Sequence, residues 1–160
     1  MAQIVTLDQF PKFNLIEVSE LTADVLAAGT HLFVLNPDSF DDEHAILVGN
    51  PAEEDSEIVI PASLSGNDIT VSALLRNHNK GTKVYKLRGY KIKVYRATNT
   101  NDVQPENISD YGSPIGTVTI QADQREVEFT DPTGGSGYWY LYTFYNDLID
   151  PAEETVINLS

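Results

Sequence analysis

The stretch "EFTDPTGGSGYWYLYTFYND", residues 128–147, decides the fold expected for this chain. Six of the fifteen Phe, Trp and Tyr residues fall within eight consecutive positions, 138–145. Apolar side chains stand at alternate positions, and a glycine-rich turn precedes them, which predicts a β-strand rather than a helix. One face of this strand would carry Tyr138, Tyr140, Tyr142 and Phe144, and the other Trp139, Leu141, Thr143 and Tyr145.

Both faces of the predicted strand are apolar. One must point into a core, and the other, with Trp139, Leu141 and Tyr145, is too apolar for a face left in water. We therefore expect a second layer, a neighbouring domain or another subunit to cover that face.

The rest of the chain shows the same alternation. In the second half, residues 90–97, 115–121 and 125–131 read as strands, 155–160 as a final edge strand, and the whole as an antiparallel sandwich. In the first half, residues 30–35, 44–49, 56–72 and 82–87 read as strands, with "SGND" at 65–68 as a hairpin turn. Residues 19–30 read as a short helix or a lead-in to a strand, and 72–78 as one helical turn. Residues 1–13 read as an extended arm docked on a neighbour.

Length and composition bound the class of protein. The 160 residues suit one ordinary domain or two small ones, and 41% hydrophobic residues are enough for a core. The absence of cysteine excludes disulfides and thiolate chemistry and favours assembly in a reducing cytosol. No export signal and no apolar run long enough to span a bilayer is visible, so we expect a soluble protein that does not enter a membrane.

Charge is distributed unevenly along the chain. The net charge of −14 argues against nucleic acid as a partner. A basic segment, residues 76–96, holds eight of the ten Lys and Arg residues and no Asp or Glu, whereas an acidic segment, residues 38–57, holds eight acids and no Lys or Arg. Two interpretations are open: neighbouring strands that neutralise each other, or a basic stripe that docks an acidic copy of the chain or another acidic partner.

None of the candidate catalytic or metal-binding motifs in the sequence has the required spacing. We therefore assign no catalytic, cofactor-binding or metal-binding residue and no cofactor. His31, His44 and His78 do not pair at ligand spacing, and His78 between two asparagines is expected to satisfy loop hydrogen bonds. The acidic loops "DSFDDE" and "PAEEDSE" lack the spacing of a calcium loop. "TGGSG" precedes a strand and lacks the Lys of a phosphate loop, and no G-x-S-x-G elbow is present. We therefore expect a protein that is not an enzyme.

Two binding interpretations of the aromatic residues remain. Trp139 and its neighbours could form a platform for sugars, although alternate positions of a strand cannot all face one ligand. Interleaved Lys and Tyr over residues 83–96 could stack single-stranded nucleic acid, against the acidic charge of the whole chain. Packing in a core and at an interface is the preferred interpretation of both patterns.

Residues 88–160 resemble fibronectin type III and related immunoglobulin-like domains. The resemblance lies in Thr130-Asp131, the turn at Gly137, Tyr138 and Tyr140, and Asn146, together with "YKIKVYRAT" at 90–98. It implies an antiparallel sandwich. The chain departs from the family pattern because the first strand pair and its usual Trp are not evident, so those strands are either missing or supplied by the first half.

Residues 21–87 resemble a small β-module of tailed-bacteriophage virion proteins that precedes an immunoglobulin-like block. The matching motifs, in order, are Ala28-Gly29-Thr30, residues 46–49, residues 57–59, residues 65–70 and His78 through Tyr85. The resemblance implies a non-enzymatic structural protein of the virion.

Together these observations give one set of expectations. The chain is all-β, with an extended arm over residues 1–20, a small β-module over 21–87 and a fibronectin- or immunoglobulin-like sandwich over 88–160. The resemblance implies a head, neck or tail component of a phage particle, assembled in the host cytoplasm. It would pack against copies of itself and other virion proteins. The alternative function is a module that binds glycan or a cell-surface protein through Trp139 or the loops.

Overall fold

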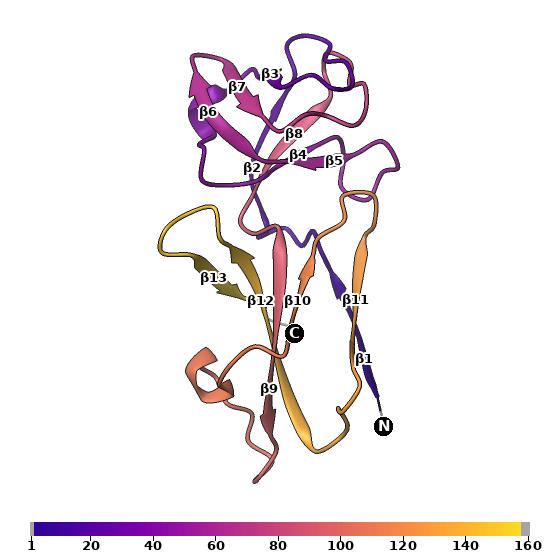
Figure 1. Ribbon diagram of the computed structural model, residues 1–160, viewed down its shortest axis with the longest axis vertical. Helices are drawn as coiled ribbons and strands as arrows, with labels where there is room; N and C mark the ends of the chain where they lie inside the picture. The colour runs from indigo at the N-terminus through magenta and orange to yellow at the C-terminus, as the bar shows by residue number, and fades with distance from the viewer. Residues whose placement is uncertain (1, 158–160) are drawn as a thin grey trace.

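The computed structural model describes residues 2–157, and the chain is all-β, as the alternating sequence patterns predict (Figure 1). Within that range lie thirteen strands and two short 3-10 helices. The elements are β1 (Gln3–Asp8), β2 (Leu15–Glu20), β3 (His31–Phe33), η1 (Pro37–Ser39), β4 (Ile46–Val48), β5 (Glu57–Val59), β6 (Pro61–Ser65), β7 (Asp68–Val71), β8 (Lys83–Leu87), β9 (Lys91–Thr98), η2 (Ile108–Tyr111), β10 (Gly116–Thr119), β11 (Glu126–Asp131), β12 (Tyr138–Asn146) and β13 (Glu153–Val156).

The strands form two units stacked along the long axis of the molecule (Figure 1). The sandwich unit, residues 2–14 and 88–157, contains a two-stranded sheet, β1-β11, and a four-stranded sheet, β10-β9-β12-β13. The inserted unit, residues 15–87, contains the sheets β2-β8-β4-β5 and β3-β7-β6. The chain thus starts in the sandwich unit, leaves it to build the inserted unit, and returns.

The expected extended arm over residues 1–20 is wrong. β1 pairs antiparallel with β11 along its whole length, from Gln3 opposite Asp131 to Asp8 opposite Glu126. β2 pairs with β8 inside the inserted unit. The first half therefore supplies a strand to the sandwich. Val5 and Leu7 of this strand point into the core, and Ile4, Thr6 and Asp8 between and beside them are exposed.

The aromatic strand lies where the sequence predicts. The face of β12 with Tyr142 and Phe144 packs into the sandwich core, against Ile92 and Val94 of β9 and Val127 of β11. The opposite face belongs to a second cluster built around buried residues Tyr95, Tyr111 and Leu141, with Trp139 packed against them. The predicted assignment of side chains to the two faces is confirmed.

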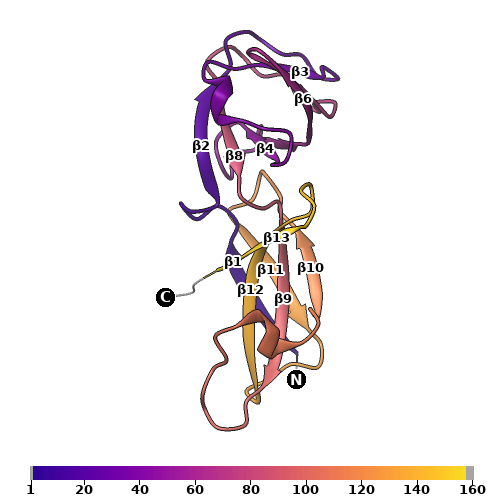
Figure 2. The ribbon, with the colours of Figure 1, turned by 90° about the vertical axis from the view of Figure 1, so that its left-hand side faces the viewer.

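The covering layer on the outer face comes from the chain itself. The segment 99–115, which includes η2, crosses the face of β9 and β12 (Figure 2). Tyr111 anchors it, being buried and donating a hydrogen bond from its hydroxyl to the Pro105 carbonyl at 2.8 Å. A second layer was predicted, but a neighbouring molecule is not required to supply it.

The inserted unit has its own core between its two sheets. Leu32, Ile69 and Val71 from β3 and β7 meet Ile46, Val48, Val59 and Val84 from the other sheet, as part of one buried cluster. The predicted hairpin at 65–68 joins β6 to β7, with Gly66 at a φ of +60 that suits glycine. Neither 19–30 nor 72–78 is helical. Ser19 and Glu20 end β2, and residues 21–30 lead into β3, which is the alternative predicted for that segment. Residues 72–78 form a bend that is joined to the 21–30 segment by the bridge between Val25 and His78.

Two buried amide side chains hold the point where the chain passes between the units. Gln9 reaches the 121–124 turn: its Nε2 donates to the Gln124 carbonyl at 2.9 Å and its Oε1 accepts from the Gln121 N–H at 2.7 Å. Asn14 donates to the Gln9 carbonyl at 2.9 Å and accepts from the Gly89 N–H at 3.0 Å. The outgoing and returning chains are thereby fixed side by side.

The units also share apolar and polar contacts. Leu47 and Leu87 of the inserted unit belong to the same buried cluster as the sandwich core. The Ser56 hydroxyl donates to the Ala122 carbonyl at 2.8 Å. Asn146 donates to the Glu43 carbonyl at 2.7 Å. These contacts set the geometry of the cleft between the units.

Replacing Gly89 by alanine is expected to destabilise the protein by about 2 kcal/mol, because a side chain there has no room. A Cβ would lie 2.8 Å from the Tyr145 nitrogen and 3.0 Å from the Phe144 carbonyl carbon, and backbone atoms cannot swing aside. Urea unfolding measures the loss. Gly135→Ala is the control, since a Cβ there meets nothing within 4 Å; equal midpoints for both variants would contradict the prediction.

Candidate functional site: the cleft between the units

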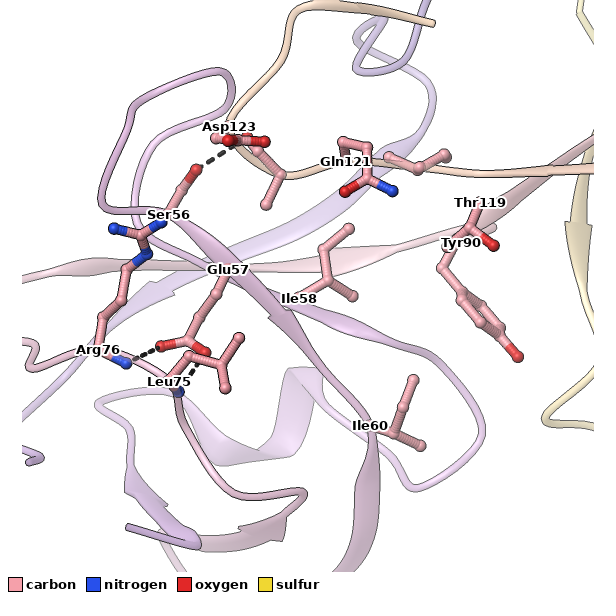
Figure 3. A pocket seen from close by; sticks show the side chains of 12 residues that line it. Ser56, Glu57, Ile58, Ile60, Leu75, Arg76, Tyr90, Thr119, Gln121 and Asp123 are labelled. Carbon is pink, nitrogen blue, oxygen red and sulfur yellow. Dashed lines mark hydrogen bonds between the residues drawn. The ribbon is translucent and has the colours of Figure 1, made fainter. Parts of the chain in front are cut away.

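A cleft of about 410 Å³ opens between the inserted unit and the sandwich unit (Figure 3). The inserted unit contributes β5, the residue after it and the 75–76 loop, and the sandwich contributes the segments around Tyr90 and 119–123. Its wall is mixed, with Ile58, Ile60 and Leu75 as apolar members and Arg76 and Gln121 as polar ones. It is a candidate binding site because both units contribute polar and apolar side chains to its wall.

Glu57 is the buried charged group of the cleft, with only 6% of its surface exposed. One carboxylate oxygen accepts the Leu75 N–H at 2.7 Å, and the other accepts the Arg76 N–H at 3.1 Å. His78 Nε2 lies 2.8 Å from the same carboxylate, and this imidazole is buried as well. Both oxygens are thus engaged in holding the 75–78 loop against β5, a structural role.

Ser56, which also lines the cleft, is hydrogen-bonded to the backbone of both units. The Ser56 hydroxyl lies 2.6 Å from the Glu53 carbonyl and 2.8 Å from the Ala122 carbonyl, so its proton is directed at backbone acceptors. Ser56 therefore links the turn that begins at Glu53 to the 119–123 segment of the sandwich unit.

Tyr90 closes the sandwich side of the cleft and turns its hydroxyl outward (Figure 3). That hydroxyl donates to Asp147, whose other oxygen takes the Lys91 ammonium at 2.7 Å. Burial and the bond to Asp147 raise the pKa of Tyr90 above its usual value. The bonds from Lys91 and Tyr90 lower the pKa of Asp147. At neutral pH the Asp147 carboxylate and the Lys91 ammonium are therefore both charged, and the Tyr90 hydroxyl is neutral.

Most cations of the basic segment are neutralised within the chain. Five of them form ion pairs: Lys83–Glu20 at 3.2 Å, Lys86–Asp41 at 2.6 Å, Lys91–Asp147 at 2.7 Å, Lys93–Glu154 at 3.2 Å and Arg96–Asp131 at 2.8 Å. One of these pairs, Lys86–Asp41, joins the basic to the acidic segment inside a single molecule. The hypothesis of an open basic stripe is corrected, and the interpretation as neutralised neighbouring strands fits the geometry.

The three histidines each face carboxylates in separate places. His31 lies 3.0 Å from Asp68, His44 lies 2.8 Å from Asp41, and His78 pairs with Glu57. No cluster of three His, Cys, Asp or Glu suited to a metal ion occurs over residues 2–157, a range that includes both acidic loops. His78 does serve its loop, as expected, with Glu57 as the partner that the sequence did not reveal.

The Trp139 side chain is partly buried against the outer face of the sandwich unit. It lies against the cluster of Tyr95, Tyr111 and Leu141, and its indole N–H is buried without an acceptor among the residues described. The Trp139 side chain is therefore half-buried in this cluster. Two lysines of the segment considered for stacking nucleic acid lie over aromatic rings of the chain itself: the Lys91 ammonium is 5.0 Å from the centre of the Tyr90 ring, and the Lys93 ammonium is 3.6 Å from the centre of the Tyr145 ring.

Sequence reasoning missed the exposed leucines beside the cleft. Leu75 lines the cleft and is 82% exposed, and Leu26, in the adjoining loop, is 71% exposed. The two loops are joined by backbone bonds, including Ala28 N–H to the Leu74 carbonyl at 2.7 Å. The repeated leucines of "VLAAG" and "ALLRN" were available as a signal, but only the fold shows which of them point outward.

Comparison with protein-family models, curated proteins and solved structures finds no match to this chain. Among residues 2–157, no helix has the length and apolar character needed to cross a bilayer.

Proposed function

We propose that this chain is a non-enzymatic structural protein that works by packing against neighbouring proteins, as a head, neck or tail component of a tailed-phage virion. The resemblance of residues 21–87 to a small β-module of tailed-phage virion proteins, which precedes an immunoglobulin-like block there as it does in this chain, supplies the setting. The surface beside the cleft supplies the physical support for packing.

The observation that carries the proposal is the pair of exposed leucines, Leu26 and Leu75. Isolated apolar residues on a surface need no explanation, but these two stand on loops that hydrogen-bond to each other, and Leu75 lines the cleft together with Ile58 and Ile60. Covering them with a neighbour would remove apolar area from water, at about 25 cal/mol per Å². We call Leu26 and Leu75 the leucine patch.

The use of the polar groups also favours a structural role. Glu57 and Ser56, which line the cleft, and the buried His78 hold loops and units together through bonds of 2.6–3.1 Å. Groups saturated in this way are suited to rigidity, which repeated packing in a particle requires.

Replacing Leu75 by aspartate is expected to weaken assembly into particles at least about tenfold while leaving the isolated protein folded, because it puts a charge on the packing surface. Incorporation of tagged chains into particles, measured by quantitative mass spectrometry, gives the readout. Val103→Asp is the control, since Val103 is 67% exposed in the segment between β9 and η2 of the other unit. Equal incorporation of both variants would contradict the proposal.

A further inference from the structure

The two sheets of the sandwich unit are unequal. Four strands, β10-β9-β12-β13, face a sheet of only two, β1-β11. Among the described residues β1 pairs with β11 alone, so one edge of β1 is not occupied by another strand. A strand edge presents backbone donors and acceptors that can pair with another chain.

The register identifies the backbone groups that face outward. The Gln9 N–H donates to the Arg125 carbonyl at 3.0 Å, so residue 9 points its polar backbone toward the β11 side. In an antiparallel pair these directions alternate along the strand, which places the N–H and C=O groups of Ile4, Thr6 and Asp8 on the free edge.

The edge of β1 lacks the usual protection against pairing. In natural proteins a lysine, a proline or a bulge in an edge strand prevents it from pairing with another chain, and Gln3–Asp8 contains none of these. Its sequence, QIVTLD, is rich in residues that favour strands, and Ile4 is 56% exposed. On the opposite edge of the same sheet, β11 carries Glu126 and Glu128 at the corresponding outward positions.

Charge beside the edge indicates which strand would fit. Asp8 lies directly opposite Glu126, and Thr6 lies opposite Glu128, so three carboxylates share the outer face of this sheet. No ion pair to these carboxylates occurs within residues 2–157. Like charges directly opposite each other destabilise a sheet, and a cation on an added strand would relieve that repulsion.

A second copy of the chain is a poor occupant. Its own edge strands, as far as the structure describes them, contain no lysine or arginine: β1, β2, β3, β5, β6, β10, β11 and β13. Each copy also carries a net charge of −14, which opposes self-association at this acidic face.

We propose that the free edge of β1 accepts an extended, basic segment of a different protein as an added strand. Backbone bonds to Ile4 and Thr6 supply the pairing. Lys or Arg at alternate positions of the added strand lie on the same face of the sheet as Asp8 of β1, and as Glu126 and Glu128 one strand further away on β11. Apolar residues at the intervening positions extend the core beside Val5. This inference rests on the proposed packing function, and it specifies one class of partner for the protein: a chain with an extended, basic segment.

The test uses two blocked synthetic peptides, one alternating Lys and Val and one alternating Glu and Val, with the full chain. The Lys-Val peptide is expected to bind, to slow hydrogen exchange at the Ile4 and Thr6 amides, and to weaken as salt rises; the Glu-Val peptide is expected not to bind. Thr6→Pro removes one outward N–H and should weaken binding about tenfold. Thr130→Pro is its matched control at the outward edge of β11, and Glu128→Lys tests the charge without touching the backbone.

Three results would overturn the inference: no slowing of exchange at Ile4 and Thr6, equal binding to Thr6→Pro and Thr130→Pro, or a dimer of the chain alone that Thr6→Pro dissociates. Its failure is separable from failure of the proposed function. If Leu75→Asp blocks assembly while the peptide does not bind, only the edge inference falls. If the peptide binds while Leu75→Asp assembles normally, only the packing role of the leucine patch falls.

Discussion

Replacing Glu57 by alanine is expected to lower the free energy of unfolding by about 4 kcal/mol, the largest loss from any single change considered for this chain. The carboxylate accepts the Leu75 and Arg76 amides and faces the buried His78. Alanine would leave two amide donors and the buried His78 imidazole without their acceptor. Urea unfolding followed by tryptophan fluorescence measures the change.

The matched control is Glu54→Ala, an exposed acid on the same acidic segment, which should change stability by less than about 0.5 kcal/mol. Glu57→Gln should fall between the two, because the amide keeps one acceptor oxygen and turns an N–H₂ toward existing donors. Similar midpoints for Glu57→Ala and Glu54→Ala would refute the structural role of Glu57.

Replacing Asp131 by asparagine is expected to cost about 2 kcal/mol. Asp131 is buried at the end of β11, where one oxygen accepts the Arg96 guanidinium at 2.8 Å and the Tyr140 hydroxyl at 2.9 Å. The other oxygen accepts the Thr133 N–H at 3.1 Å and so shapes the turn before the aromatic strand. Asparagine keeps the shape of the side chain and removes its charge, so the measured loss is the electrostatic part of the stability that Asp131 contributes.

The same variant should change the pH dependence of stability. Burial alone would raise the pKa of Asp131, but hydrogen bonds from Tyr140 and Arg96 outweigh it and lower the pKa below the ordinary value. A lowered pKa in the folded state contributes stability above the unfolded pKa of about 3.9, and that stability is lost as pH falls through the folded value. Wild-type should therefore lose more stability than Asp131→Asn between about pH 4 and pH 2. Parallel curves would contradict this account.

The strands were predictable because their signal is local. Alternation along 138–145 assigned Tyr142 and Phe144 to one face and Trp139 and Leu141 to the other, and the two buried clusters have those members. The period of a strand is two residues, so side-chain direction follows from position once the strand is recognised.

The pairing of β1 was not predictable in the same way. "QIVTLD" reads as an extended segment, but its partner β11 lies more than a hundred residues further along the chain. Nothing local distinguishes a strand that returns to a distant sheet from an arm that leaves the molecule. The cover of the aromatic face by segment 99–115 was missed for a similar reason, since a polar, turn-rich sequence hides the anchoring role of Tyr111.

The candidate site depended on contacts between distant positions. Glu57 and His78 stand in two separate sequence motifs, and only the fold of the inserted unit brings them to 2.8 Å. Counting charges in the basic segment likewise could not show that Lys91 meets Asp147, just after β12, and that Lys93 meets Glu154 on β13. Composition sets the balance of charge, whereas topology decides which charges are left unpaired.

The most direct test of the central claim, that this chain is a structural component of a phage particle, is electron microscopy of purified particles together with quantification of their proteins. We predict a fixed number of copies per particle, with Leu26 and Leu75 covered by a neighbouring chain. Absence of the chain from intact particles, or its presence with both leucines in water, would contradict the account.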